Sequence, residues 1–207
     1  AFVLMLSSCP MAPGASIVQP VSVQASGAHV NRSFDATIDG SQLSDPSVVE
    51  TGDRVPVTAP TNGDEADARW GDPANGVLIY DLGGSFNLTG MWLWNYNEYW
   101  GGAYYNQRGL SAVTVAFSSD GANFSSDELF SPAAAPELAE SLHEECLFAG
   151  MQSRVTHVRF TEMANHDPNG GLTGFGEVRF LIPEPSTMVF AASALLGLVA
   201  FGRKRLH

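Results

Sequence analysis

The chain has few basic residues and almost no cysteine. Its 207 residues include 22 acidic side chains against 10 Lys and Arg, and the one lysine is Lys204. Before residue 183, 21 acids stand against seven arginines, so this part of the chain carries a net charge of −14. A nucleic-acid partner needs basic surface to replace the counterions of its phosphates, so we expect none. The two cysteines, Cys9 and Cys146, are too few for a disulfide framework.

Recognisable catalytic motifs are also lacking. The stretch His143-Glu144-Glu145-Cys146 has no second histidine at the spacing that a zinc-binding helix needs. The sequence contains no Gly-Xaa-Ser-Xaa-Gly nucleophile elbow and no phosphate-binding loop. We therefore predict that the chain is not an enzyme, with an unrecognised envelope hydrolase as the remaining catalytic alternative.

The first residues resemble the end of a secretory signal. An apolar run over residues 1–6 is followed by small residues, Pro and Gly, with cleavage expected between Ala12 and Ser16. Leu6-Ser7-Ser8-Cys9 also resembles a lipobox, in which Cys9 would be lipidated. We predict that residues 1–27 are a signal-peptide remnant and leader, and both modes of processing stay open. The alternative is a buried first strand, which the lack of alternation disfavours.

The last residues have the composition of a membrane anchor. Pro183-Glu184-Pro185-Ser186 leads into an uncharged run over residues 186–202, and Arg203, Lys204 and Arg205 follow at once. A helix of this length would span about 25 Å, which is the short limit for crossing a bilayer. Because bases are retained on the cytoplasmic side, the sequence predicts a C-terminal single transmembrane helix with the rest of the chain outside.

This order of a Pro-Glu-Pro motif, an apolar helix and a basic end resembles the PEP-CTERM sorting signal, over residues 182–207. The resemblance implies that a membrane exosortase recognises and processes the tail, in a Gram-negative-type bacterium that makes exopolysaccharide. The exported protein would first sit in the inner membrane and then, after processing, at the cell surface or in the extracellular matrix. A plain single-span tail anchor is the alternative.

Between these two segments the sequence indicates an all-β domain. Short β-branched and aromatic runs, bounded by Gly, Asn, Asp and Pro, lie at residues 77–84, 88–96, 111–121, 153–160 and 176–182. Val113, Val115 and Phe117 alternate with small residues, which predicts one buried face. Val158 and Phe160 follow the same pattern.

Two segments of this domain depart from strand patterns. Residues 136–146 place Leu138 and Leu142 four positions apart, which is a helical spacing. Residues 44–69 are polar and rich in Pro, Gly and Asp, and we expect a long surface loop there.

The order of the pieces resembles a discoidin-like domain, of the coagulation-factor C-type or galactose-binding-like kind. The residues that carry the resemblance are Ile38-Asp39-Gly40, Trp70, Tyr80-Asp81-Leu82-Gly83-Gly84, Trp94-Asn95-Tyr96-Asn97-Glu98, Arg108-Gly109, Ser119-Asp120-Gly121, Arg154 to Phe160, and Gly176-Glu177-Val178-Arg179-Phe180. The resemblance implies a single jelly-roll β-sandwich over residues 28–181.

The same resemblance implies a structural calcium ion. Its ligands would be Asp39, Ser44 and Glu177, together with backbone carbonyls, because calcium takes six to eight oxygen ligands. The long loop after Asp39 departs from the family pattern. The alternative is that Asp39 caps a turn and Glu177 is a solvated strand residue.

Residues 95–109 are the candidate glycan-binding loop. Aromatic rings stack on the apolar face of a sugar, while amides and Arg bond its hydroxyls. The candidate residues are Tyr96, Asn97, Glu98, Trp100, Tyr104, Tyr105 and Arg108. The alternative is that part of the cluster is core, because Trp92, Trp94 and Tyr96 share strand parity.

Together these patterns predict an exported, exosortase-processed surface or matrix protein that binds without catalysis. Exopolysaccharide is the first candidate ligand. The alternative is a structural envelope or matrix protein without a small-molecule ligand.

Overall fold

The computed structural model describes residues 16–26, 34–40, 57–58, 68–70, 76–97, 99–100, 102–137, 140–141, 143–167 and 173–183. Within those ranges no helix is long and apolar enough to cross a membrane. The predicted membrane helix over residues 186–202 lies outside them. So do Glu184, Pro185 and Ser186 of the sorting motif and the basic end Arg203, Lys204 and Arg205.

Nearly all of the regular structure in the described residues is β, as predicted. The strands are β1 (Ser16–Val18), β2 (Ser22–Ser26), β3 (Val57–Thr58), β4 (Ala68–Trp70), β5 (Val77–Asn95), β6 (Tyr99–Trp100), β7 (Ala103–Tyr104), β8 (Leu110–Ser118), β9 (Ser125–Phe130), β10 (Glu140–Ser141), β11 (Glu144–Asn165) and β12 (Thr173–Ile182). Two short 3₁₀ helices, η1 (Phe34–Thr37) and η3 (Asn106–Arg108), join them.

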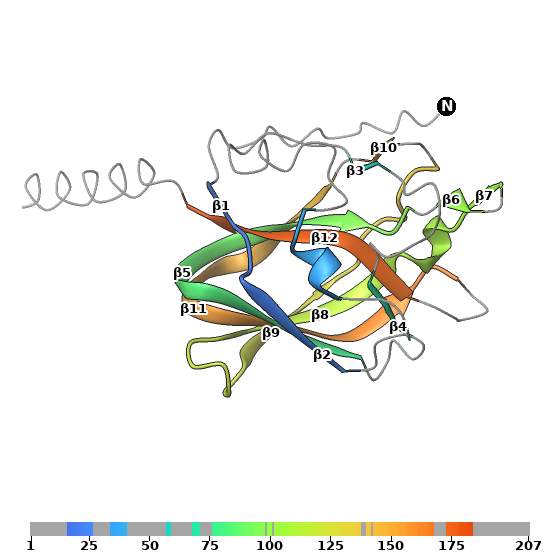
Figure 1. The fold of residues 1–207 in the computed structure, drawn as a ribbon. Coiled ribbons are helices and arrows are strands. Elements are labelled where there is room, and N and C mark those ends of the chain that lie inside the picture. Colours follow the sequence, from blue (N-terminus) through green and yellow to red (C-terminus); the bar gives the residue numbers. More distant parts are fainter. Residues whose placement is uncertain are drawn as a thin grey trace, which may run out of the picture.

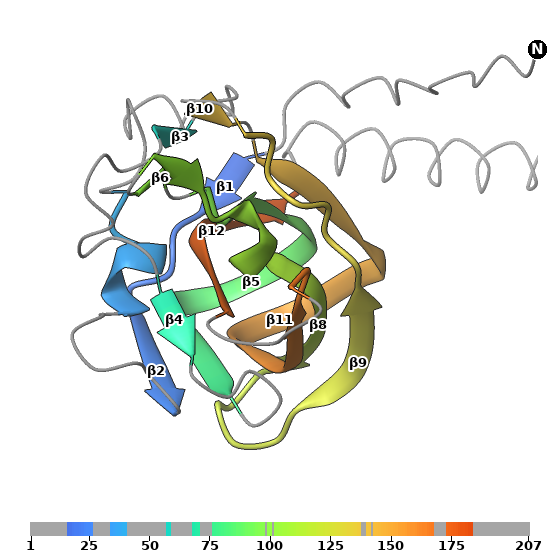
Figure 2. The same ribbon diagram turned by 90° about the vertical axis from the view of Figure 1, so that its right-hand side faces the viewer.

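Two long strands connect the layers of the sandwich (Figures 1 and 2). The main sheet has the order β1-β12-β5-β11-β8-β9, with β2 also paired to β5 and β4 to β12. The first part of β5 pairs with β2 and its last part pairs with β12. β11 follows β5 along its length and pairs with β8 through its second half. Both strands therefore bend from one layer into the other.

The bends lie where the regular ladder is interrupted. The pairing of β11 with β5 shifts register between Leu147 and His157. In β5, Gly83 has a φ of 69°, a left-handed value that favours glycine. A Cβ atom at Gly83 would also lie 2.6 Å from Cγ1 of Val21. The sequence predicted two strands, over residues 77–84 and 88–96, and that division was wrong because β5 bends in this region without ending.

The core between the layers is aromatic. Tyr80 and Phe160 meet edge to face with ring centroids 5.2 Å apart, and Phe180 contacts both rings in the same way. Tyr80 is fully buried, and its hydroxyl oxygen lies 3.2 Å from Oγ1 of Thr37 in η1. Burial raises the pKa of Tyr80 above its usual range because the phenolate would lose its hydration.

The residues predicted to be buried in the strands are buried. They are Val113, Val115 and Phe117 in β8 and Val158 and Phe160 in β11. The prediction of a single buried face was wrong for β8, because Thr114 and Ala116, on the other side of that strand, are buried as well.

Two predictions about segment boundaries need correction. β1 pairs with β12 and β2 pairs with β5, so residues 16–26 belong to the sheet and not to a leader ending at residue 27. The helical spacing in residues 136–146 was misleading. The described part of that segment is extended, with β10 paired to β3 and β11 starting at Glu144.

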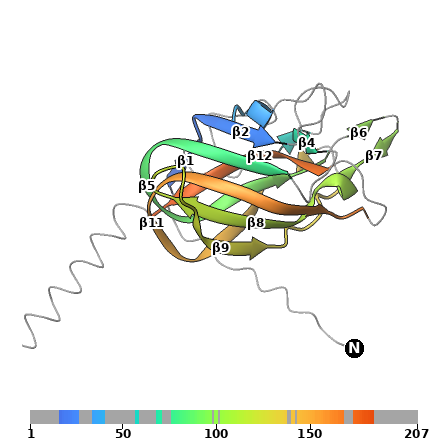
Figure 3. The same cartoon turned by 90° about the horizontal axis from the view of Figure 1, so that it is seen from below.

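The described body begins and ends at one end of the sandwich. Ser16 of β1 pairs directly with Ile182 of β12. Figures 1 and 3 show this end beside the bends of β5 and β11, with β6, β7 and β4 at the opposite end. The loop predicted to bind glycan is therefore remote from the point where the chain continues into residues 183–207.

Candidate functional site

The end of the sandwich that carries residues 95–109 is organised by Asn95, the last residue of β5. Its Nδ2 donates to the carbonyl oxygens of Leu110 and Ala133, at 2.8 and 2.7 Å. Its Oδ1 accepts from the backbone N–H groups of Tyr96 and Leu110, at 2.9 and 2.7 Å. One buried amide thus ties three segments of backbone together, which fixes the positions of the side chains that they carry.

Two of the predicted glycan contacts are buried in this end. Tyr96 is 0% exposed and Asn97 is 3% exposed. Both side chains therefore pack inside this end of the sandwich. The prediction that they face a ligand was wrong for these two residues. The alternative stated for this cluster holds for Trp92, Trp94 and Tyr96, since all three are buried. The side chains of Glu98 and Trp100 lie outside the described residues.

The remaining three predicted residues lie at the accessible surface of the loop, together with the exposed Gln107. Tyr104 of β7, Tyr105 and Arg108 are each partly exposed. The guanidinium carbon of Arg108 lies 4.2 Å from the centroid of the Tyr105 ring, within the range of a cation–π contact. This contact spans one turn of η3 and places the guanidinium, with its fork of N–H donors, over one face of the Tyr105 ring.

A second anchor joins η3 to the neighbouring loop, residues 131–137. Nδ2 of Asn106 donates to the carbonyl oxygen of Ala135 at 2.8 Å. On the other side of this loop, Oε2 of Glu144 accepts from the backbone N–H of Ala133 at 2.7 Å. The loop is therefore held from both flanks.

A small pocket of about 260 Å³ opens beside these contacts. It is lined by Leu93, Asn95, Ala133, Ala134, Ala135, Pro136, His143 and Glu144. His143 stacks on Trp92 with ring centroids 4.1 Å apart, so its imidazole is part of the wall. No pattern in the sequence indicates this pocket, because its lining comes from β5, β11 and a run of alanines. Only the long-range pairing of these strands brings them together.

The predicted calcium ligands differ in burial. Glu177 on β12 is 0% exposed, and its Oε2 accepts from the backbone N–H of Gly40 at 3.1 Å. Asp39, just before that glycine, has an exposed side chain. Ser44 lies outside the described residues. The alternative of a solvated Glu177 was wrong, and calcium itself stays a prediction.

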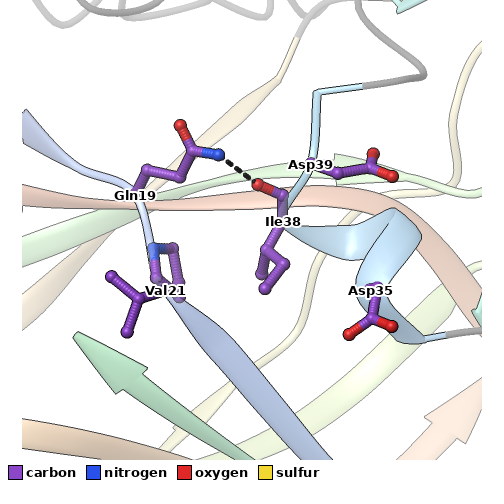
Figure 4. Close-up of a pocket in the computed structure, with 6 residues that line it drawn as sticks. Gln19, Val21, Asp35, Ile38 and Asp39 are labelled. Carbon is purple, nitrogen blue, oxygen red and sulfur yellow. Dashed lines mark hydrogen bonds between the residues drawn. The ribbon is translucent and has the colours of Figure 1, made fainter. Parts of the chain in front are cut away.

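A larger pocket of about 570 Å³ lies near Asp39 (Figure 4). It is lined by Gln19, Pro20, Val21, Asp35, Ile38 and Asp39. The amide of Gln19 donates to the carbonyl oxygen of Ile38 at 2.6 Å and bridges the pocket's two sides. Among the described side chains, no three His, Cys, Asp or Glu residues gather in a group that could hold a metal ion.

The fold is shared with solved carbohydrate-binding modules. The family 32 module of Clostridium perfringens NanJ, solved with galactose, matches with a TM-score of 0.50 at 9% identity, over 81% of this chain and 98% of that one. A fucose-binding module of Streptococcus pneumoniae matches with a TM-score of 0.52 at 11% identity, over 84% and 99%. CpGH89CBM32-5 of Clostridium perfringens, solved with GalNAc-β-1,3-galactose, gives 0.52 at 14%, over 80% and 99%.

These likenesses define the class of fold, a discoidin-like β-sandwich of the family 32 type, and so confirm that part of the sequence prediction. No protein-family model matches the chain, and no curated protein does.

Proposed function

We propose that the protein is an exported, non-catalytic glycan-binding module. The observation that carries the proposal is the Tyr105–Arg108 pair, which is partly exposed at one end of the sandwich. The fold supports it, because three solved modules with this fold are one in complex with galactose, one in complex with GalNAc-β-1,3-galactose and a fucose-binding module. Tyr104 and the exposed Gln107 extend the same surface.

The chemistry of this surface suits a neutral or mildly polar sugar ring. An aromatic face takes the C–H side of the ring, and the guanidinium offers several N–H donors to its hydroxyls. Stacking on Tyr105 restricts the rotamers of Arg108, so less entropy is lost when a ligand orders it. The hydrogen bonds from Asn95 and Asn106 to backbone carbonyls likewise order the backbone that supports this surface before a ligand binds.

The proposed cellular setting rests on the tail. An exosortase would recognise Pro183-Glu184-Pro185-Ser186, with the helix over residues 186–202 in the membrane and the bases 203–205 on its cytoplasmic side. Ser16 and Ile182 are paired at the far end from η3, so the glycan-binding end would point away from the membrane. Exopolysaccharide of the cell's own matrix is then the ligand that this surface meets first.

Titration calorimetry against polysaccharide fractions from such a matrix tests the proposal. We expect saturable binding, weakened about tenfold by Tyr105→Ala and by Arg108→Ala, since a stacked or charge-assisted contact contributes roughly 1–2 kcal/mol. Arg154→Ala is the matched control, because Arg154 is exposed at the opposite end and the change in charge is the same. Equal weakening by Arg154→Ala would mean that the net charge of the protein, and not this site, controls binding.

The second candidate is a structural envelope or matrix protein whose partners are proteins. Exposed apolar side chains favour it, since Leu147 and Met151 on β11 are 59% and 50% exposed. Failure of every polysaccharide fraction to bind, with the protein folded, would decide for this candidate.

A further inference from the structure

Two opposite charges are buried side by side on β12. Glu177 and Arg179 are two residues apart and so lie on the same face of the strand, where they are 0% and 3% exposed. Nη1 of Arg179 pairs with Oε1 of Glu177 and also donates to the carbonyl oxygen of Val178 at 3.0 Å. The other carboxylate oxygen, Oε2, accepts from the N–H of Gly40. Oε2 of Glu177 is therefore hydrogen-bonded, and Oε1 is ion-paired to Arg179 without a hydrogen bond.

The surroundings of this pair are aromatic. In the pairing of β12 with β5, Trp94 lies opposite Glu177 and Trp92 lies opposite Arg179, and both indoles are buried. A carboxylate in such surroundings needs a compensating positive charge, because burial of an unpaired ion is strongly unfavourable. Either a bound metal ion or a protein cation can meet this requirement.

Among the described residues, the oxygens at this place do not fit calcium. Calcium takes six to eight oxygens, yet Glu177 is committed to Arg179 and Gly40, and the carboxylate of Asp39 is exposed. A divalent ion on Glu177 would also lie next to the guanidinium of Arg179, which repels it. The donor set therefore argues against a metal ion on Glu177.

We propose that Arg179 takes the place of a structural calcium ion on Glu177, so that the sandwich is stable without calcium. Arg179 is then a built-in counterion that locks β12 to the turn after η1 through Glu177 and Gly40. This proposal does not depend on the proposed function, because its test measures stability and needs no glycan.

Thermal unfolding of the full chain, in chelator and in millimolar calcium, is the first test. Magnesium at the same concentration controls for ionic strength. We expect melting temperatures equal within about 1 °C, because a ligand that does not bind the folded state does not stabilise it. A saturable rise in calcium that disappears in Glu177→Gln would overturn the proposal, since the ion would then bind through Glu177. A rise that persists in Glu177→Gln places the ion elsewhere and leaves Arg179 as the counterion.

Substitutions of the pair give a second test. We expect Arg179→Met to lower the melting temperature by about 10 °C, since it leaves a buried carboxylate unpaired. The double variant Glu177→Gln/Arg179→Met should recover most of that loss, because the charge that needed a partner is gone. If the losses of the two single variants simply add in the double variant, the residues are not coupled and the proposal fails. Should Arg179→Met not fold, the calcium titration of the wild-type chain still decides.

Discussion

Removing the side chain of Asn95 should destabilise the candidate binding end of the sandwich. In Asn95→Ala, four hydrogen bonds are lost, two donated by Nδ2 and two accepted by Oδ1. Leu110 and Tyr96 are fully buried, so their backbone groups gain no water in exchange. At about 1 kcal/mol for each net hydrogen bond, the free energy of unfolding should fall by about 4 kcal/mol.

Urea unfolding, monitored by tryptophan fluorescence, measures this loss of free energy. Two substitutions on η3 serve as references for its size. Asn106→Ala removes one hydrogen bond, from Nδ2 to the carbonyl oxygen of Ala135, and should cost about 1 kcal/mol. Gln107→Ala changes an exposed amide and should stay within about 0.5 kcal/mol of the wild type. A loss below about 1 kcal/mol in Asn95→Ala, or one no larger than in Asn106→Ala, would refute the view that Asn95 organises this end.

Three further predictions concern other parts of the sandwich. Gly83→Ala should lower the free energy of unfolding by about 2 kcal/mol, because φ is left-handed and the new methyl group meets Val21. Adding Val21→Ala should restore part of this in urea unfolding, and no recovery would contradict the clash. Hydrogen bonds from the backbone and side chain of Asn123, from the backbone of Ala122 and from Ser118 hold the pKa of Asp120 well below its usual range. A lowered folded-state pKa gives stability that is present above the unfolded pKa, about 3.9, and lost as the pH falls below it. Melting curves from pH 5 downward should therefore decline less steeply in Asp120→Asn, and an unchanged slope would count against this role. Burial, reinforced by the carboxylates of Glu144 and Glu145, raises the pKa of the Cys146 thiol to about 12. In a Cys9→Ser background the native protein should resist a thiol reagent at pH 8 and react once unfolded, and equal rates in both states would show that the thiol is accessible.

Several features of the sandwich could be predicted because they depend on neighbours in the sequence. The alternation of Val113, Val115 and Phe117 is a two-residue period, and it places one face of β8 in the core wherever that strand pairs. The shortage of bases is a property of composition alone. Glycine, asparagine and aspartate around the apolar runs indicated where turns interrupt the strands.

The extent of the strands could not be predicted from local patterns. Gly83 and Gly84 look like the end of a strand in sequence, yet β5 continues through them because β11 pairs with it before and after this point, β2 pairs with its first part and β12 with its last. Residues 16–26 have weak strand patterns, and they are strands because β12 and β5 offer them free edges. Pairing with a distant partner supplies the backbone hydrogen bonds that such segments would otherwise lack.

The candidate site also has some features that the sequence predicts and others that depend on the fold. The gathering of aromatic residues, amides and one arginine in residues 95–109 can be read directly from the chain. The burial of Tyr96 and Asn97 and the accessibility of Tyr105 and Arg108 depend on the folded chain, because the hydrogen bonds of Asn95 fix the backbone at the start of the loop. The fold also places Arg179 against Glu177. Alternation along β12 gives both residues the same face, but only burial of that face makes their charges depend on each other.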